Sequence, residues 1–449
     1  MSMKGMTIEK ALRACGGRFC GAAAPDTELG RVIIDSREVT PGDLFVAYKG
    51  ERVDGHDYIG AALDRGAACC LAERVPEGET RGVIVVDEVQ RALEDIAAAY
   101  RATLSLPIIG ITGSVGKTSA KEMISAVLSS RLSVCKTDKN LNNQIGVPMT
   151  LSRIAPGDEV AVVEMGISGF GEMSRLGRMV RPQIAVYTLI GHAHLEFLHD
   201  LDGVLRAKTE MLDYMPEDGC VIYNGDDEKL RAYPFARRTI SFGLGEGCDV
   251  HAEHIVSDAE STKCDIVCAH RRMQIVIPAF GRHLVYAALE GAAVGMELGL
   301  TDEEIVRGIA SFRTVGRRSA VIRTGKITLL DDCYNSNAEA LRSGIDSLSE
   351  LPGRSVCILG DMLELGETGW EAHRAGGAYA AEKGVARLLC CGELAEAYCE
   401  GAGGIARRFP DRESLIAALK DEIREGDCVL VKASHGAHFE EISEALKVL

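Results

Sequence analysis

The chain has 449 residues, which is about three times the length of an ordinary domain, so the length predicts three domains. Hydrophobic residues make up 46% of the chain and charged residues 26%, a composition that excludes a disordered protein. The 50 Lys and Arg residues stand against 66 Asp and Glu residues, and the net charge of −16 argues against a general nucleic-acid binder, which needs a basic face.

The sequence also favours neither a membrane protein nor a secreted protein. It has no run of about 18 apolar residues, so we expect no membrane insertion. Residues 1–10 lack a basic start followed by an apolar run, so they predict no secretory signal. The 15 cysteines are odd in number and favour reduced thiols. We therefore expect a cytoplasmic protein. Separately, we expect a monomer whose partners are small molecules.

The first predicted domain, residues 1–103, has the pattern of a small α/β unit. Residues 32–34 and 44–47 are short apolar runs and predict strands. Residues 41–43, Pro-Gly-Asp, predict a turn between them.

The second predicted domain, residues 104–314, alternates strand and helix signals. Residues 107–112 form an apolar run bounded by turn residues, which is typical of a buried parallel strand. Helical sequence follows from 117 to about 130, and further strands are predicted over 160–163, 184–187 and 221–223. This alternation predicts an α/β fold with a parallel sheet and right-handed crossovers.

The third predicted domain, residues 315–449, has a doubly wound, Rossmann-like layout but no GxGxxG fingerprint. Its predicted strands are 327–330, 356–359, 387–391 and 428–431, and its predicted helices are 338–348, 370–382 and 414–423.

The strongest chemical signal is a glycine-containing loop at the end of the predicted strand 107–112. It reads Thr-Gly-Ser-Val-Gly-Lys-Thr-Ser over 112–119 and opens a helix, as phosphate-binding loops do. Lys117 is predicted to reach the β- and γ-phosphates, and the Thr118 hydroxyl to ligate Mg²⁺. The strict Walker spacing requires Gly at position 111, where this chain has Ile, so the loop is a variant.

Other candidates in the second domain are weaker when each is taken alone. Glu164 ends a predicted strand and could hold Mg²⁺, or be an ordinary strand-end acid. His192 and His194 lack a third ligand pattern, so a structural or supporting role competes with a metal role. Lys208 lies on a predicted helix, where lysines are usually solvated. The amides of 140–148 could donate to phosphate or carboxylate oxygens, or cap a helix.

In the third domain, polar residues follow two predicted strands. Residues 331–337, Asp-Asp-Cys-Tyr-Asn-Ser-Asn, run from a strand end into a helix, where acids suit a ribose hydroxyl. Arg317 could supply a charge to a phosphate, and Lys432 lies just beyond an apolar strand. Each of these residues alone could equally be a cap or a surface charge.

Taken together and in this order, the motifs resemble the Mur ligase family, the ATP-dependent amide ligases of peptidoglycan precursor assembly. The resemblance spans nearly the whole chain. The runs 140–148 and 359–366 are most similar to the branch that adds D-alanyl-D-alanine to a UDP-MurNAc-tripeptide. The segments that carry the resemblance are 35–37, 41–47, 54–56, 112–119, 140–143, 163–166, 193–196, 206–208, 331–337, 359–366 and 431–432.

The resemblance implies a three-domain architecture, with a UDP-sugar-peptide domain, a central ATP-binding domain and a C-terminal domain that contacts nucleotide and dipeptide. It implies ATP and Mg²⁺ as cofactors, and an acyl phosphate made from the tripeptide carboxylate. Lys208 matches a lysine that relatives carry as a carbamate. The implied residues are Gly113, Ser114, Gly116, Lys117, Thr118, Ser119, Arg317 and Asp331 for the nucleotide; Thr118, Glu164, His194 and Lys208 for metal; Lys117, Lys208, His194, Asn335 and Lys432 for catalysis; and Asp35, Ser36, Arg37, His56, Asn142, Asn143 and Asn337 for the substrates.

The chain departs from the family pattern at three places. Where the family usually has His-Asn-x-x-Asn, this chain has His283, Leu284 and Ala287, so both asparagines expected beside the nucleotide are absent. Leu189 replaces a usual Asn, and residues 432–435 read Lys-Ala-Ser-His instead of Lys-Gly-Ser-Arg. Three functions therefore stay open: the D-alanyl-D-alanine ligase, a related ligase with another acceptor, and a catalytically silent nucleotide-binding paralogue.

Overall fold

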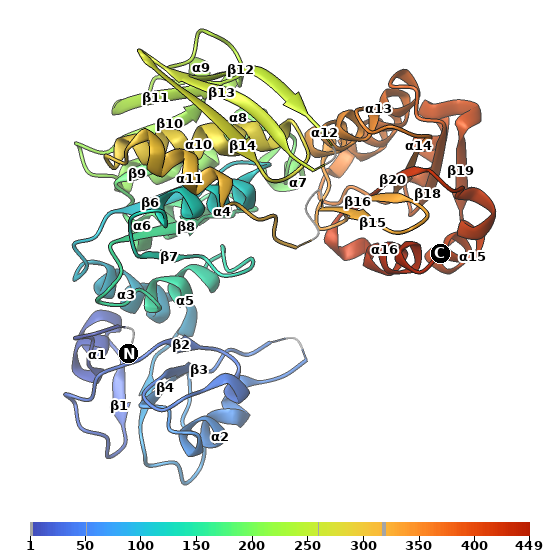
Figure 1. Cartoon of the computed structure of the whole chain (residues 1–449). Helices are drawn as coiled ribbons and strands as arrows, with labels where there is room; N and C mark the ends of the chain where they lie inside the picture. Colours follow the sequence, from blue (N-terminus) through green and yellow to red (C-terminus); the bar gives the residue numbers. More distant parts are fainter. Residues whose placement is uncertain (1–2, 51, 259, 317–319) are drawn as a thin grey trace.

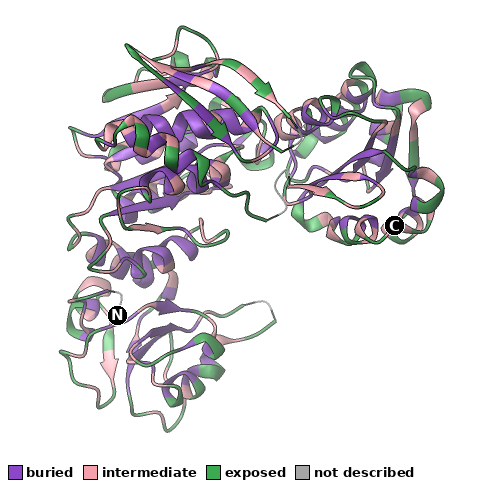
Figure 2. Ribbon diagram, viewed as in Figure 1, coloured by how far each residue is buried: buried purple, intermediate pink, exposed green. Residues whose placement is uncertain are grey.

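The computed structural model describes residues 3–50, 52–258, 260–316 and 320–449. Three β-sheets follow one another along the chain, each with its own helices (Figure 1). The central strands of each sheet are buried, whereas β1, β12, β14 and β19 have exposed residues (Figure 2). No helix within the described ranges is both long and apolar enough to cross a membrane.

The first unit is a five-stranded sheet in the order β1-β5-β4-β3-β2, in which only β1 runs antiparallel to its neighbour. The predicted strands at 32–34 and 44–47 are confirmed as β2 and β3. The long helix α3 lies between this sheet and the second unit, where the Tyr100 hydroxyl donates to the Ile154 carbonyl at 2.7 Å (Figure 1). The elements are α1 (Ile8–Cys15), β1 (Arg18–Cys20), β2 (Val32–Ile33), η1 (Ser36–Glu38), β3 (Leu44–Val46), η2 (Gly55–Tyr58), α2 (Ile59–Asp64), β4 (Cys69–Ala72), β5 (Val83–Val85) and α3 (Val89–Arg101).

The second unit is a nine-stranded sheet in the order β14-β13-β12-β11-β10-β9-β6-β8-β7. The four predicted strands are confirmed as β6, β8, β9 and β10, and they run parallel as predicted. The parallel strands β7, β11 and β12 and the antiparallel extension of β13 and β14 were not predicted. Both faces of the parallel strands are buried because α4, α10 and α11 cover one face and α5, α6 and α8 the other.

The elements of the second unit are β6 (Ile108–Thr112), α4 (Lys117–Leu128), β7 (Val134–Lys136), α5 (Gly146–Ser152), β8 (Val160–Glu164), α6 (Glu172–Val180), β9 (Ile184–Tyr187), α7 (Leu195–Leu198), α8 (Leu201–Thr209), η3 (Glu210–Tyr214), β10 (Cys220–Asn224), α9 (Glu228–Ala232), β11 (Arg238–Gly243), β12 (Val250–Ser257), β13 (Thr262–Cys268), β14 (Arg271–Ile277), α10 (His283–Glu297) and α11 (Asp302–Ala310).

The third unit is a six-stranded sheet in the order β15-β16-β20-β17-β18-β19, with only β15 antiparallel. Its sheet has helices packed on both faces, as predicted for a doubly wound layout. Phe280 of the second unit packs into this core. The elements are β15 (Ala320–Arg323), β16 (Thr328–Asp332), α12 (Ala338–Ser349), β17 (Ser355–Leu359), η4 (Gly366–Thr368), α13 (Gly369–Glu382), β18 (Arg387–Cys391), α14 (Ala395–Ala402), η5 (Gly403–Ile405), β19 (Ala406–Phe409), α15 (Arg412–Glu422), β20 (Cys428–Lys432), η6 (His435–Ala437) and α16 (Glu440–Lys447).

Candidate functional site

A cavity of about 730 Å³ lies where the second and third units meet. Its walls come from the carboxyl ends of β8 and β16, from the loop between β6 and α4, and from the helices α10 and α12. The carboxyl ends of parallel strands are where α/β sheets bind their ligands, because the following loops and helix N-termini meet there. The cavity is therefore the candidate active site.

The predicted phosphate loop forms one wall of the cavity. Ser114, Gly116, Lys117 and Ser119 line it directly. The Lys117 ammonium donates to the Gly113 carbonyl at 2.7 Å, so the loop folds around its own lysine. Gly113 has φ +151°, and a Cβ built on it would lie 1.9 Å from the Thr188 hydroxyl, so only glycine fits there.

Glu164 is the centre of a buried polar cluster beside this loop. The Thr118 hydroxyl donates to its Oε2 at 2.9 Å, and the Asn142 amide donates to its Oε1 at 2.8 Å. The Lys121 ammonium lies 3.9 Å from Oε2 and is almost fully buried. Asn142 and Asn143 both line the cavity, although Asn143 also accepts from the Gly146 amide at the start of α5. Lys121 was missed in the sequence because a lysine within a helix has no motif of its own.

The donor set around Glu164 suits Mg²⁺ rather than a metal held by protein alone. No group of three or more His, Cys, Asp or Glu side chains in the described part of the chain could form a complete metal site. Mg²⁺ usually takes one or two protein oxygens and completes its shell with water and phosphate oxygens. The Thr118 hydroxyl and the Glu164 carboxylate, next to a phosphate loop, fit that requirement.

Two histidines connect the second unit to the third. The His192 Nδ1 lies 2.5 Å from Glu339 Oε1, at the start of α12. The His194 Nδ1 lies 2.5 Å from Glu364 Oε2, and this contact lowers the pKa of Glu364. His194 and Glu339 line the cavity. The two glutamates were not among the predicted site residues, because they lie far from the histidines in sequence.

Lys208 lies on α8, as predicted, but it is not a solvated residue. Its side chain is buried and does not belong to the lining of the cavity. Burial lowers the pKa of Lys208 well below its ordinary value, and the nearby charge of Lys117 lowers the pKa further. Both effects favour the neutral amine over the ammonium ion.

The third unit contributes Asp332 rather than Asp331. The Lys432 ammonium is 2.6 Å from Asp332 Oδ2 and donates to the Asn335 carbonyl at 2.9 Å, and all three residues line the cavity. Asp331 points the other way, because side chains alternate along β16, and it accepts from the Ser443 hydroxyl at 3.0 Å. The expectation that Asp331 faces the nucleotide is therefore corrected in favour of Asp332.

Asn337 and Arg317 are the other two residues of this unit that were predicted to contact substrate or nucleotide. Asn337 lines the cavity and also caps α12, where its side chain accepts from the Ala340 amide at 2.9 Å. Arg317 lies outside the described residues.

The predicted UDP-sugar residues lie in the first unit and do not line the central cavity. Asp35 is paired with Arg37, which lowers the pKa of Asp35 to about 2. Ser36 lies between them and is buried. His56 is buried as well, with its ring between Asp54 and the Glu73 amide. A separate cavity of about 360 Å³ lies beside His56.

Helix α10 supplies a wall of the cavity in the region of the missing asparagines. His283, Tyr286, Ala287 and Glu290 all line the cavity. The Tyr286 hydroxyl donates to Asp226 Oδ2 at 2.9 Å. Glu290 was missed, although an acid within the apolar run 287–294 was a visible signal.

Comparisons with known proteins agree over the whole chain. Residues 29–106 match the family model described as Mur ligase family, catalytic domain, residues 111–295 match the Mur ligase middle domain, and residues 317–435 match the Mur ligase glutamate ligase domain. The chain is 33% identical to UDP-N-acetylmuramoyl-tripeptide–D-alanyl-D-alanine ligase of Bacillus subtilis strain 168, with 98% of each chain covered.

Two solved structures have a similar fold. The crystal structure of MurF from Acinetobacter baumannii matches with a TM-score of 0.91 at 30% identity and covers 99% of both chains. MurF ligase from Thermotoga maritima, solved in complex with ADP, matches with a TM-score of 0.83 at 28% identity and covers 93% of this chain and 97% of that one.

Proposed function

Because the chain belongs to the Mur ligase family, we propose that it joins D-alanyl-D-alanine to UDP-MurNAc-tripeptide at the expense of ATP. The product is the UDP-MurNAc-pentapeptide of peptidoglycan synthesis, made in the cytoplasm. The observation that carries the proposal is the cavity itself, in which a phosphate loop on one unit faces the Lys432–Asp332 pair on another.

The chemistry requires that an inert carboxylate be made reactive. One carboxylate oxygen of the tripeptide attacks the γ-phosphorus of ATP, the bond to the β-phosphate oxygen breaks, and ADP leaves. The amine of D-alanyl-D-alanine then attacks the acyl phosphate carbon and loses a proton. Inorganic phosphate leaves with the oxygen that came from the carboxylate.

In this proposal the protein positions the reactants and neutralises charge. The loop from Gly113 to Ser119, which includes Ser114 and Gly116, binds the phosphates, and the Lys117 ammonium moves from the Gly113 carbonyl to the transferring group. The Ser114 amide donates to the Leu189 carbonyl at 2.7 Å and so fixes the loop. Lys432 and Asn335 face that group from the third unit, and Asp332 fixes the position of the lysine. Asn142, Asn143 and Asn337 contact the substrates.

Thr118 and Glu164 are the residues proposed to hold Mg²⁺, which supplies Lewis-acid stabilisation of the phosphate charge. The Nδ1 of His194 is occupied by Glu364, which fixes the ring and leaves Nε2 as the nitrogen for a second metal. The lowered pKa of Lys208 fits carbamoylation, because only an unprotonated amine adds to carbon dioxide. A carbamate on Lys208 carries a negative charge and lies next to the Lys117 ammonium.

We also propose which substrate each of the three units binds. The first unit, 1–103, takes the UDP-sugar end of the substrate through Asp35, Ser36, Arg37 and His56. The second, 104–314, binds ATP, and the third, 315–449, binds the incoming dipeptide and part of the nucleotide.

The test is an ADP-release assay with a panel of UDP-linked acceptors and dipeptides. ADP release that requires both UDP-MurNAc-tripeptide and D-alanyl-D-alanine supports the proposal. Release that requires another acceptor identifies a related ligase. Nucleotide binding without turnover on any acceptor pair contradicts an enzymatic function.

A further inference from the structure

One face of α10 forms a continuous wall of the cavity. His283, Tyr286, Ala287 and Glu290 follow the spacing i, i+3, i+4, i+7, which places them on the same side of a helix. The wall is about 10 Å long, since each helical residue advances about 1.5 Å. Its polar groups therefore meet different parts of an extended ligand.

Glu290 is the unusual member of this wall. Its side chain is only 3% exposed, in a helix whose neighbouring residues are almost all apolar. A Cβ on the adjacent Gly291 would lie 3.0 Å from the Val127 side chain and 3.2 Å from that of Met123, so α10 packs closely against α4. The carboxyl group therefore reaches the cavity from a nearly closed hydrophobic contact.

The surroundings of Glu290 decide its charge. Burial raises the pKa of Glu290 well above its ordinary value, which favours the neutral carboxylic acid over the carboxylate. A neutral acid has one hydrogen-bond donor and one acceptor, as an amide side chain does. Burying such a group without a partner is costly, so its presence in an apolar helix points to a ligand.

The position along the cavity indicates which part of a nucleotide it meets. The phosphate loop and Glu164 form the charged part of the site, and Ser119 in the first turn of α4 lines the same cavity as Glu290. On α10 the hydroxyl of Tyr286 donates to Asp226, and Ala287 presents only a methyl group to the cavity. Glu290, one turn further, is left to contact the base.

We propose that Glu290 recognises the adenine base of ATP, replacing the side-chain amide that this chain lacks at Ala287. This inference rests on the proposed ATP-dependent function. The acid O–H donates to N7 of adenine, and its carbonyl oxygen accepts from the 6-amino group on the same edge. A base with a 6-oxo group offers two acceptors there, N7 and O6, so it can satisfy only the O–H and leaves two oxygens facing each other.

The test compares ATP with ITP, which has the 6-oxo base, in wild type and in three variants. Glu290→Gln keeps a donor and an acceptor, and Glu290→Met keeps the volume but removes both. Glu290→Met combined with Ala287→Asn returns an amide one turn earlier. We expect wild type and Glu290→Gln to have a higher kcat/KM with ATP than with ITP. In Glu290→Met the ratio of these two kcat/KM values should fall about tenfold, because the loss of one or two hydrogen bonds has an effect of that size.

In Glu290→Met the KM for ATP should rise while kcat stays nearly unchanged. The double variant should regain part of the preference for ATP over ITP. A merely structural role of Glu290 would alter thermal stability without altering the ATP-to-ITP ratio. Direct binding of ADP and IDP by calorimetry gives the same comparison without turnover. An unchanged ratio in Glu290→Met, or no preference in wild type, overturns this inference alone. Failure of wild type to bind ADP overturns the proposed function as well.

Discussion

Lys117 is the residue whose removal should affect turnover most specifically. Its ammonium contacts the Gly113 carbonyl of its own loop, so Lys117→Ala should fold normally. We expect kcat to fall on the order of a hundred- to a thousandfold, because a preorganised charge at the transferring phosphate is lost. Steady-state ADP release measures the effect, and circular dichroism checks the fold. Near-normal turnover would exclude Lys117 from the reaction.

The adjacent aspartates of β16 form a matched pair for a second prediction. Asp332→Asn should lower kcat/KM about ten- to a hundredfold, because the charged partner of Lys432 is lost. Asp331→Asn should instead lower thermal stability, since Asp331 accepts from Ser443 and Cys333 in the core against α16. The opposite pattern, with activity lost only in Asp331→Asn, would show that the nucleotide side of the strand has been misassigned.

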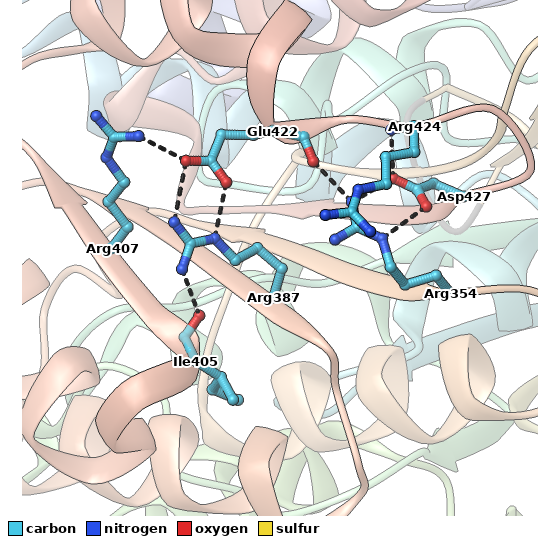
Figure 3. Close-up of polar contacts among 7 residues, drawn as sticks. All are labelled: Arg354, Arg387, Ile405, Arg407, Glu422, Arg424 and Asp427. Atoms are coloured by element: carbon cyan, nitrogen blue, oxygen red, sulfur yellow. Dashed lines mark hydrogen bonds and ion pairs between the residues drawn. The ribbon is translucent and has the colours of Figure 1, made fainter.

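At the scale of elements, a network of arginines and acids ties the strands of the third unit to α15, at the ends away from the cavity (Figure 3). Glu422, at the end of α15, accepts from Arg387 on β18 at 2.7 and 3.0 Å and from Arg407 on β19 at 2.6 Å. Arg354 donates to the Glu422 carbonyl and forms an ion pair with Asp427 just before β20. The network holds the sheet that carries Lys432.

The pKa of Glu422 gives a pH-dependent prediction. Hydrogen bonds from Arg387 and Arg407 lower the pKa to about 2, so the carboxylate stabilises the fold fully above the ordinary glutamate pKa. That stabilisation is lost as the pH falls toward 2. Glu422→Gln should lower the free energy of unfolding at pH 7 by about 1–2 kcal/mol.

Urea unfolding at several pH values measures the difference between wild type and Glu422→Gln. The difference should shrink as the pH falls from about 4.5 toward 2. Glu425→Gln is a suitable control, because Glu425 is exposed and lies three residues along the same chain segment. A difference that stays constant with pH would show that the ion pairs do not stabilise the fold.

The sequence predicted those elements whose local pattern is strong. The strands before the phosphate loop and before Glu164 were predicted because continuous apolar runs between turn residues are typical of buried parallel strands. The strands β12 to β14, in which β13 runs antiparallel to both neighbours, were not predicted, because exposed residues interrupt their apolar pattern. Asp331 was preferred to Asp332 because sequence alone does not say which side of a strand faces the cavity.

Contacts between segments that are far apart in the chain could not be predicted from the sequence either. The partners of His192 and His194 are Glu339 and Glu364, each more than a hundred residues away, and no local pattern joins them. The charge state of Lys208 and Glu290 depends on burial by helices from elsewhere in the chain. The motifs therefore identified the chemistry, and the fold was needed to show the partners.

In the whole molecule, the two histidine–glutamate contacts join the third unit to the second. An acyl phosphate must be shielded from water, so closure over the cavity belongs to the proposed mechanism. We expect the double variant Glu339→Gln and Glu364→Gln to favour an open arrangement and to raise the KM for ATP.

Solution scattering measures this opening directly. Without nucleotide, the double variant should have a larger radius of gyration than wild type, and a non-hydrolysable ATP analogue should reduce the difference. Glu367→Gln serves as a control, since Glu367 is exposed and lies close to Glu364 in sequence. Equal radii of gyration in all proteins would show that these contacts do not control closure.

We propose above that the protein activates a peptide carboxylate in this cavity by phosphorylating it. The most direct measurement uses UDP-MurNAc-tripeptide labelled with ¹⁸O in the reacting carboxyl group, together with ATP and D-alanyl-D-alanine. We expect mass spectrometry to find one ¹⁸O atom in each released phosphate, because the carboxylate oxygen bonds to the γ-phosphorus before the amine attacks. Unlabelled phosphate, released at the same rate as the amide product, would contradict it.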